Sequence, residues 1–235
     1  MDISHNKITV KSVPSIVKFI QASVELTKLN LSYNNIGDGD GDDGLEKIIK
    51  NLGNLEIFNI SGTNISVKSI NVLAHKIGEN WPIKELYIAK NKINGKNMAK
   101  LFNTLFINKT LEKIDISYNY LNDSMPAICK FLNQMASLKY LNITNCFCDE
   151  ELVNLFLTLK HNKTLSTLKI GRIGFYALEA IVACLETNNI ITKIAFSVNE
   201  EECEFANDSD EYDNIENEMD KMAKQIRTKI KQNKK

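Results

Sequence analysis

Residues 111–121 of the chain read LEKIDISYNYL, and this stretch decides the fold. The same pattern occurs at residues 26–36, LTKLNLSYNNI, and at residues 83–93, IKELYIAKNKI. In each copy the apolar residues at the fourth and sixth positions lie two apart, so both point to one side of a short extended segment. We therefore predict a β-strand with one buried face in every copy of the pattern.

Weaker copies extend the pattern over most of the chain. They begin at residues 55, 138, 165 and 191, and the chain starts inside a truncated copy that ends at Ile8. The positions equivalent to the asparagine are 6, 34, 63, 91, 119, 146, 173 and 199, with spacings of 28, 29, 28, 28, 27, 27 and 26 residues. So regular a period indicates about eight repeats of 26–29 residues, of which the first is truncated.

Between the strands the spacing of apolar residues changes from two to three or four, which is typical of helices that bury one face. The helical stretches are residues 45–52, 70–77, 98–105, 128–135, 152–159 and 178–185. Ser124 before Met125 and Pro126 has the pattern of a capped helix start. One strand and one helix per repeat predict an α/β solenoid, a curved horseshoe with parallel strands on the concave face and helices on the convex face.

The pattern resembles the leucine-rich-repeat family, in the longer-repeat class that includes ribonuclease inhibitor, RanGAP, tropomodulin and NOD-like receptors. The resemblance covers residues 1–199, which we expect to form a leucine-rich-repeat domain, and leaves residues 200–235 as a helical tail or cap. It is specific for the fold and much less so for the partner.

The residue after each strand turn is expected to be structural, because a side-chain amide there can satisfy backbone groups of stacked loops. The residues expected in this role are Asn6, Asn34, Asn91, Asn119 and Asn199, with Cys146 as a replacement that the family accepts. The pattern turns both thiols of Cys146-x-Cys148 toward the interior, so we do not expect a metal site. Sequons at Asn59, Asn108 and Asn162 are attributed to chance in an Asn-rich chain.

The carboxyl-terminal part changes composition sharply. Residues 200–220 contain eleven acids and residues 221–235 contain seven Lys or Arg. An apolar stripe recurs every three or four residues, which predicts an amphipathic helix that packs on the last repeat, offers its stripe to a partner, or frays. The members of this stripe are Tyr212, Ile215, Met219, Met222, Ile226 and Ile230.

Two other segments leave alternatives open. No cap is evident before Ile3, so the amino-terminal edge is closed by the stretch at residues 13–20, meets a partner, or belongs to a shortened relative of a longer protein. The acidic loop at residues 37–44 starts like a calcium loop, but Asp43 and Ile49 stand where that loop requires glycine and a bidentate glutamate. We expect a solvated turn there.

Function is expected on the outward positions of the strands, which alternate with the buried ones. Aromatic and charged side chains gather there in the central repeats, as in a protein-binding hot spot. The predicted partner-binding residues are Tyr87, Lys113, Asp115, Tyr118, Tyr140, Asn142, Lys169 and Arg172.

Composition and motifs favour a binding protein over an enzyme. The 29 basic and 29 acidic residues give no net charge, so nucleic acid is an unlikely partner. His5, His75 and His161 fall in different repeats away from any nucleophile, and no phosphate loop or metal motif appears, so we expect no catalytic residue, metal or cofactor.

We accordingly predict a monomeric scaffold or adaptor that binds another protein through the concave face and takes no small-molecule substrate. Five cysteines without disulfide spacing, and no signal peptide or membrane span, suggest a cytoplasmic, reducing location. The resemblance also implies two alternatives, a RanGAP-like activator of a small GTPase and a tropomodulin-like cytoskeletal factor.

Overall fold

A computed structural model describes residues 1–37, 44–198 and 209–234 of the chain. Strands and helices alternate along it, as the period predicts. The elements are η1 (Val10–Ser12), α1 (Val13–Ala22), β1 (Lys28–Asn30), α2 (Gly44–Lys50), β2 (Ile57–Asn59), α3 (Val67–Gly78), β3 (Glu85–Tyr87), α4 (Gly95–Leu105), β4 (Lys113–Asp115), α5 (Met125–Gln134), β5 (Tyr140–Asn142), α6 (Asp149–Leu159), β6 (Thr167–Ile173), α7 (Phe175–Leu185), β7 (Lys193–Val198) and α8 (Ser209–Gln232).

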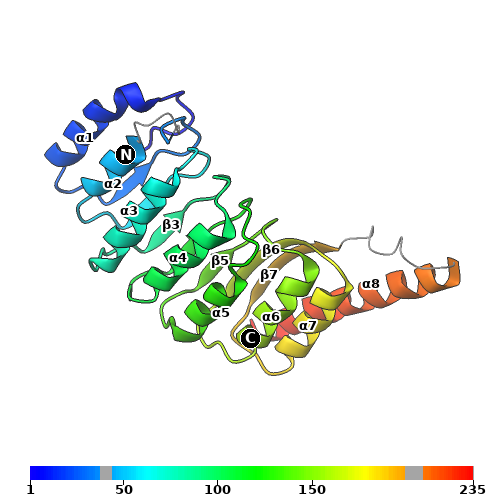
Figure 1. The fold of residues 1–235 in the computed structure, drawn as a ribbon. Helices are drawn as coiled ribbons and strands as arrows, with labels where there is room; N and C mark the ends of the chain where they lie inside the picture. Colours follow the sequence, from blue (N-terminus) through cyan, green and yellow to red (C-terminus); the bar gives the residue numbers. More distant parts are fainter. Residues whose placement is uncertain (38–43, 199–208, 235) are drawn as a thin grey trace.

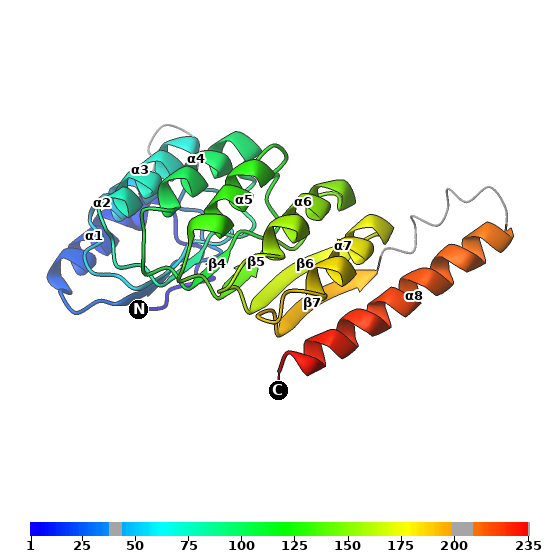
Figure 2. The same cartoon turned by 90° about the horizontal axis from the view of Figure 1, so that it is seen from below.

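The strands form one parallel sheet in the order β1 to β7, so each repeat pairs with the next repeat along the chain. Helices α1 to α7 form a single layer against one face of this sheet (Figure 1). Figure 2 shows the two layers from below, with the strands on the side away from these helices. The fold is the α/β solenoid that the sequence predicts, and its strand face is the concave side.

The core lies between the two layers. Leu86 and Ile88 from the third strand region and Leu101 and Leu105 from α4 are completely buried. Equivalent residues of every repeat join one continuous apolar cluster. Because an outward residue separates the two buried ones in each strand, the opposite face of the sheet remains available for polar and aromatic side chains.

The asparagines after three of the strand turns, Asn34, Asn91 and Asn119, bond backward to the preceding repeat. Asn119 is buried; its Oδ1 accepts hydrogen bonds from the backbone N–H groups of Asn91 at 3.1 Å and Ile93 at 3.0 Å. Its Nδ2 donates to the carbonyl oxygens of Ile88 at 3.1 Å and Ile116 at 2.8 Å. One side chain therefore satisfies backbone groups of two repeats, as do Asn34 and Asn91.

Two repeats use a substitute, and one expectation fails. Thr63 Oγ1 donates to the Ile60 carbonyl oxygen at 2.7 Å, and the buried Cys146 Sγ donates to the Ile116 carbonyl oxygen at 3.2 Å. Cys148, however, does not point inward as expected, because it occupies the exposed N-cap position of α6. The two thiols therefore lie in different environments.

A second row of buried asparagines, missed in the sequence, holds the turns from helix to strand. Asn108 Nδ2 donates to the Trp81 carbonyl oxygen at 2.8 Å, and its Oδ1 accepts from the N–H groups of Thr110 at 2.9 Å and Leu111 at 2.8 Å. Asn162 and Asn188 make the equivalent bonds two and three repeats later. Asn108 and Asn162 are therefore structural residues.

Two loop expectations are also resolved. Ser124 precedes α5 as expected, but its hydroxyl donates to the Leu121 carbonyl oxygen at 2.6 Å and does not cap the helix. At the amino-terminal end, Val13, Ile16 and Ile20 form the buried face of α1, and this helix packs beside α2. Residues 38–43 of the acidic loop and Asn199 lie outside the described residues.

Helix α8 covers the last repeat. Its residues Met219, Ala223, Ile226 and Ile230 are buried, and Ile215 and Met222 are partly buried against the same core. Asn233 follows the helix, and its Nδ2 donates to the Ile191 carbonyl oxygen at 2.9 Å. Figure 2 shows α8 beside α7 and β7 at the end of the stack. The side chain of Tyr212, the first member of the expected stripe, lies outside the described residues.

Candidate functional site on the concave face

The centre of the concave face carries a cluster built around Glu85. Tyr87 Oη donates to Glu85 Oε2 at 2.5 Å, and Lys113 Nζ from the next strand donates to Glu85 Oε1 at 2.7 Å. Burial alone would raise the pKa of Glu85, but the hydrogen bonds from Lys113 and Tyr87 outweigh burial and lower it. Burial and the bond to Glu85 raise the pKa of Tyr87 far above its usual value. This cluster is thus a fixed, charged and aromatic surface.

Asp115 and Asn142 are less available than the sequence suggests. Asp115 Oδ1 accepts from the backbone N–H and the hydroxyl of Ser117, and its Oδ2 accepts from Asn142 Nδ2 at 2.8 Å. Asn142 Oδ1 accepts in the same way from Thr144, and only 8% of Asn142 is exposed. Both residues hold the ends of their own strands, so the expectation of an open contact surface at Asn142 is wrong.

Tyr140 and Lys169 form an aromatic and cationic pair on neighbouring strands. Lys169 Nζ lies 5.7 Å from the centre of the Tyr140 ring, within the range of a cation–π interaction. β5 and β6 place the two residues one diagonal apart, because Asn142 is directly opposite Lys169 and Tyr140 is opposite Thr167. The structure therefore brings these two predicted residues together, half-buried and facing outward.

A row of side chains runs along the edge of the sheet where the strands end. His5, Tyr33, Gly62, Lys90 and Tyr118 occupy the same repeat position, and all have φ between 55° and 63°. The His5 and Tyr33 rings stack with centroids 4.3 Å apart, and Lys90 Nζ lies 5.7 Å from the Tyr33 ring centre and 5.1 Å from that of Tyr118. We call these five residues the edge row.

The edge row contains only one predicted site residue, Tyr118. The other exposed members could have been found from their shared position in the repeat, since left-handed backbone turns the side chain of each in the same direction. Gly62 is the exception that makes room, because a Cβ there would lie 3.0 Å from the Tyr33 ring. Tyr33 is 42% exposed and Tyr118 is 48% exposed, so both rings keep a free edge for a partner.

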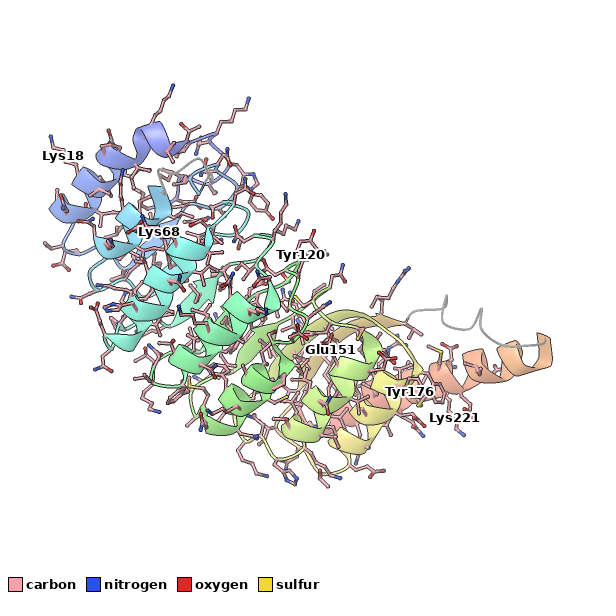
Figure 3. The ribbon with its side chains drawn as sticks, viewed as in Figure 1. Lys18, Lys68, Tyr120, Glu151, Tyr176 and Lys221 are labelled. Carbon is pink, nitrogen blue, oxygen red and sulfur yellow. The ribbon has the colours of Figure 1, made fainter. Side chains whose placement is uncertain are left out.

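Two further exposed residues extend this edge. Arg172, the remaining predicted residue, is exposed at the equivalent repeat position near the end of β6. Tyr120, labelled in Figure 3, follows Tyr118 by two residues and is 68% exposed. Aromatic and cationic side chains thus occur at the strand ends from the first repeat to the seventh, with Gly62 and Asn145 at the equivalent position in the third and sixth repeats.

The described residues do not assemble a metal or thiol site. Among them no group of three or more His, Cys, Asp or Glu side chains is close enough to hold a metal ion. Burial raises the pKa of Cys146 to about 12 and that of Cys184 to about 11, which disfavours the reactive thiolate. In the described part of the chain, no helix is long and apolar enough to cross a membrane.

Known proteins share this repeat. A family described as Leucine Rich repeat matches residues 25–48. Two curated relatives are homologs of protein phosphatase 1 regulatory subunit 37, one from Caenorhabditis briggsae, 26% identical over 185 residues, and one from Caenorhabditis elegans, 26% identical over 127 residues. The alignments cover 73% and 53% of this chain but only 19% and 13% of the relatives, so the chain spans about a fifth of their length or less.

Two solved structures are similar at a low level. Leiomodin-1 Actin-Binding Site 2 aligns with a TM-score of 0.44 and 16% identity, covering 84% of this chain and 97% of that one. The tropomodulin C-terminal domain of Caenorhabditis elegans aligns with a TM-score of 0.39 and 9% identity, covering 92% and 96%. The regular strand-and-helix repeats and the matched segment together show that the fold is an α/β leucine-rich-repeat solenoid.

Proposed function

We propose that this chain is a non-catalytic protein-binding module that holds its partner against the concave face and the edge row. The observation that carries the proposal is the number of half-exposed aromatic and cationic side chains that gather on this side. Aromatic residues beside charges supply most of the energy in protein interfaces. Their neighbours already fix Tyr33, Tyr87 and Tyr140, so binding would cost little side-chain entropy.

The curated relatives supply a first partner to test. Their names describe regulatory subunits of protein phosphatase 1, so we propose this phosphatase as the first candidate. The two other functions implied by the repeat, activation of a small GTPase and binding to actin filaments, rest on resemblance alone.

Site-specific photocrosslinking tests the proposed surface without assuming the partner. A photoreactive amino acid replaces Tyr118 in the edge row or, as the matched control, Tyr176 on α7, which is 60% exposed (Figure 3). In extract from the native source, we expect a specific crosslinked protein from position 118 and not from position 176. Equal crosslinking from both positions, or none from position 118, would contradict the proposal.

Calorimetry with purified protein phosphatase 1 tests the candidate partner. We expect the double variant Tyr87→Ala and Tyr140→Ala to weaken binding about tenfold or more, because two central aromatic anchors are lost. The variant Tyr176→Ala controls for the loss of an exposed ring elsewhere. If the native chain, the double variant and the Tyr176→Ala variant all bind the phosphatase with the same affinity, the phosphatase binds another surface.

A further inference from the structure

Charge is divided unevenly along the concave face. At the starts of strands β2 to β5, each glutamate pairs with a lysine of the next repeat. These pairs are Glu56 with Lys84 at 2.7 Å, Glu85 with Lys113 at 2.7 Å and Glu112 with Lys139 at 3.1 Å. The central part of the face is therefore neutralised by its own side chains, in a pattern that repeats with the solenoid.

This alternation stops after β5. The outward residues of β6 and β7 include Lys169 and Lys193 but no Asp or Glu. Neither lysine has an ion-pair partner within the described residues, and Lys193 is exposed. Tyr140 lies beside Lys169, and the exposed Arg172 follows at the end of β6. We call Tyr140, Lys169, Arg172 and Lys193 the basic end of the concave face.

We infer that the basic end binds an acidic segment of the partner protein. This inference rests on the proposed function and adds the chemistry of the ligand. Carboxylates of the segment pair with Lys169 and Lys193, and an apolar or aromatic side chain packs beside Tyr140. Lys169 and Lys193, which pair with no carboxylate of the described residues, attract an anionic partner and fix its register.

Nucleic acid is the other polyanion to consider, and the geometry favours a peptide. Proteins that bind single strands offer aromatic ring faces on which successive bases stack. At the basic end Tyr140 is the only outward aromatic residue described on β5 to β7, and Lys169 lies over its ring. A peptide needs no such platform, because carboxylates pair with the lysines directly.

Fluorescence anisotropy with the full chain tests the inference. The probe is a labelled peptide of alternating glutamate and tyrosine, and its reference has glutamine in place of glutamate. We expect binding of the acidic peptide only, with an affinity that falls as salt rises. The double variant Lys169→Glu and Lys193→Glu should weaken binding about tenfold or more, because two attractive contacts become repulsive.

The matched control makes the same charge change elsewhere. Lys100 on α4 and Lys163 after α6 are exposed and lie on the helical side, so Lys100→Glu with Lys163→Glu should leave peptide binding unchanged. Circular dichroism of both double variants checks that they fold. An equal loss in both, equal binding of the glutamine peptide, or tighter binding of an oligothymidylate would each overturn the inference.

The same variants separate the inference from the proposed function. If Lys169→Glu with Lys193→Glu leaves crosslinking from position 118 unchanged, the partner uses the concave side without an acidic segment, and only the inference fails. If crosslinking from position 118 never occurs while the acidic peptide still binds at the basic end, the proposed protein partner fails instead.

Discussion

Asn119 shows how much of this fold depends on single polar side chains. It is buried and bonds to the backbone of two repeats through both its oxygen and its nitrogen. Removal of the side chain would leave the N–H groups of Asn91 and Ile93 buried without their partner. We therefore predict that Asn119→Ala lowers the free energy of unfolding by roughly 2–4 kcal/mol.

Asn6 offers the control for this prediction. It stands at the same repeat position but is exposed, and its side-chain Nδ2 donates to the Ser4 carbonyl oxygen at 2.8 Å. Asn6→Ala should change the free energy of unfolding by less than about 0.5 kcal/mol. Urea unfolding followed by circular dichroism measures both, and equal losses would show that the backward bonds contribute little.

The ionisation of Glu85 makes the stability of the folded chain depend on pH. Its folded-state pKa lies below the usual 4.5, so the stability it contributes is fully present above that value. This stability is lost as the pH falls through the lowered pKa, where the carboxylate is protonated and its attraction to Lys113 ends. We predict that Glu85→Gln unfolds at a less pH-dependent midpoint than the native chain below pH 4.5.

Urea midpoints of the two proteins across the acid range check this prediction. The variant Glu79→Gln is a suitable control, because the Glu79 side chain is 54% exposed on the convex side and makes only long contacts, with His75 at 3.4 Å and Lys76 at 3.8 Å. If Glu85→Gln and Glu79→Gln follow the native pH profile equally, the Glu85 cluster does not contribute to acid stability.

The sequence predicts single residues well where the repeat position determines their role. The asparagines after the strand turns follow from position alone, because stacked loops need an amide there. Cys148 departs from the strand pattern because the strand has ended before it and the residue is the N-cap of α6. Asn142 is buried because its side chain turns back to accept a hydrogen bond from the Thr144 N–H, which an alternation of faces does not reveal.

At the scale of elements, Gly95 controls how closely a helix start approaches the next repeat. It is the first residue of α4, and a Cβ there would lie 1.5 Å from the Asn122 carbonyl oxygen. Gly95→Ala must therefore move the backbone of one repeat, and we predict a loss of roughly 1–3 kcal/mol in the free energy of unfolding.

Gly53 provides the opposite case. A Cβ there would meet nothing within 4 Å, and the residue lies in the exposed turn after α2. Gly53→Ala should leave stability unchanged or raise it by up to about 1 kcal/mol, because the unfolded chain loses freedom. Thermal unfolding of both variants tests the pair, and the prediction fails if Gly95→Ala is the milder change.

Helix α8 is expected to act as the cap of the carboxyl-terminal end. Ile226 is 1% exposed and packs with the core of the last repeat. We predict that Ile226→Ala destabilises the chain by roughly 2–5 kcal/mol, as for other buried Ile-to-Ala changes. Thr228→Ala, an exposed change in the same helix, is the control. A negligible effect of Ile226→Ala in urea unfolding would show that α8 is not a cap.

The elements themselves follow from the sequence because two periods, two and about 3.6, determine which residues are buried. The position of α8 does not follow. Its apolar stripe fits a packed helix and a partner-binding helix equally, since both bury one face. Ile226 and Ile230 pack against the last repeat through tertiary contacts, which no local pattern encodes.

At the scale of the whole molecule, stability is expected to vary along the stack. Each repeat contacts only its neighbours, so a terminal repeat has support on one side alone. The Ile3 amide bonds to the Asn30 carbonyl oxygen at the amino-terminal edge, whereas the Ile116 amide bonds to Asn142 between two repeats. We predict that hydrogen exchange at Ile3 is about a hundredfold faster or more than at Ile116.

Exchange measured by NMR or mass spectrometry under native conditions tests this gradient. Uniform protection along the strands would show instead that the solenoid opens as one cooperative unit.

The partner is the part of function that the sequence leaves open. Leucines and asparagines specify the scaffold, whereas outward side chains such as Tyr140 and Lys169 are not needed to bury the core. The cation–π contacts of Lys90 and Lys169 join residues of different repeats, so they emerge only when the repeats are stacked. The fold and the candidate surface can thus be predicted from this sequence, but binding specificity also depends on the surface of the partner.

The backward direction of the asparagine bonds bears on how the protein is made. Asn34, Asn91 and Asn119 each complete the loop of the repeat that precedes them in the chain. During synthesis on a ribosome, the loop N–H groups of a newly emerged repeat therefore cannot all be hydrogen-bonded until the asparagine of the next repeat has emerged. We expect the nascent solenoid to consolidate one repeat behind the exit tunnel, from the amino terminus onward.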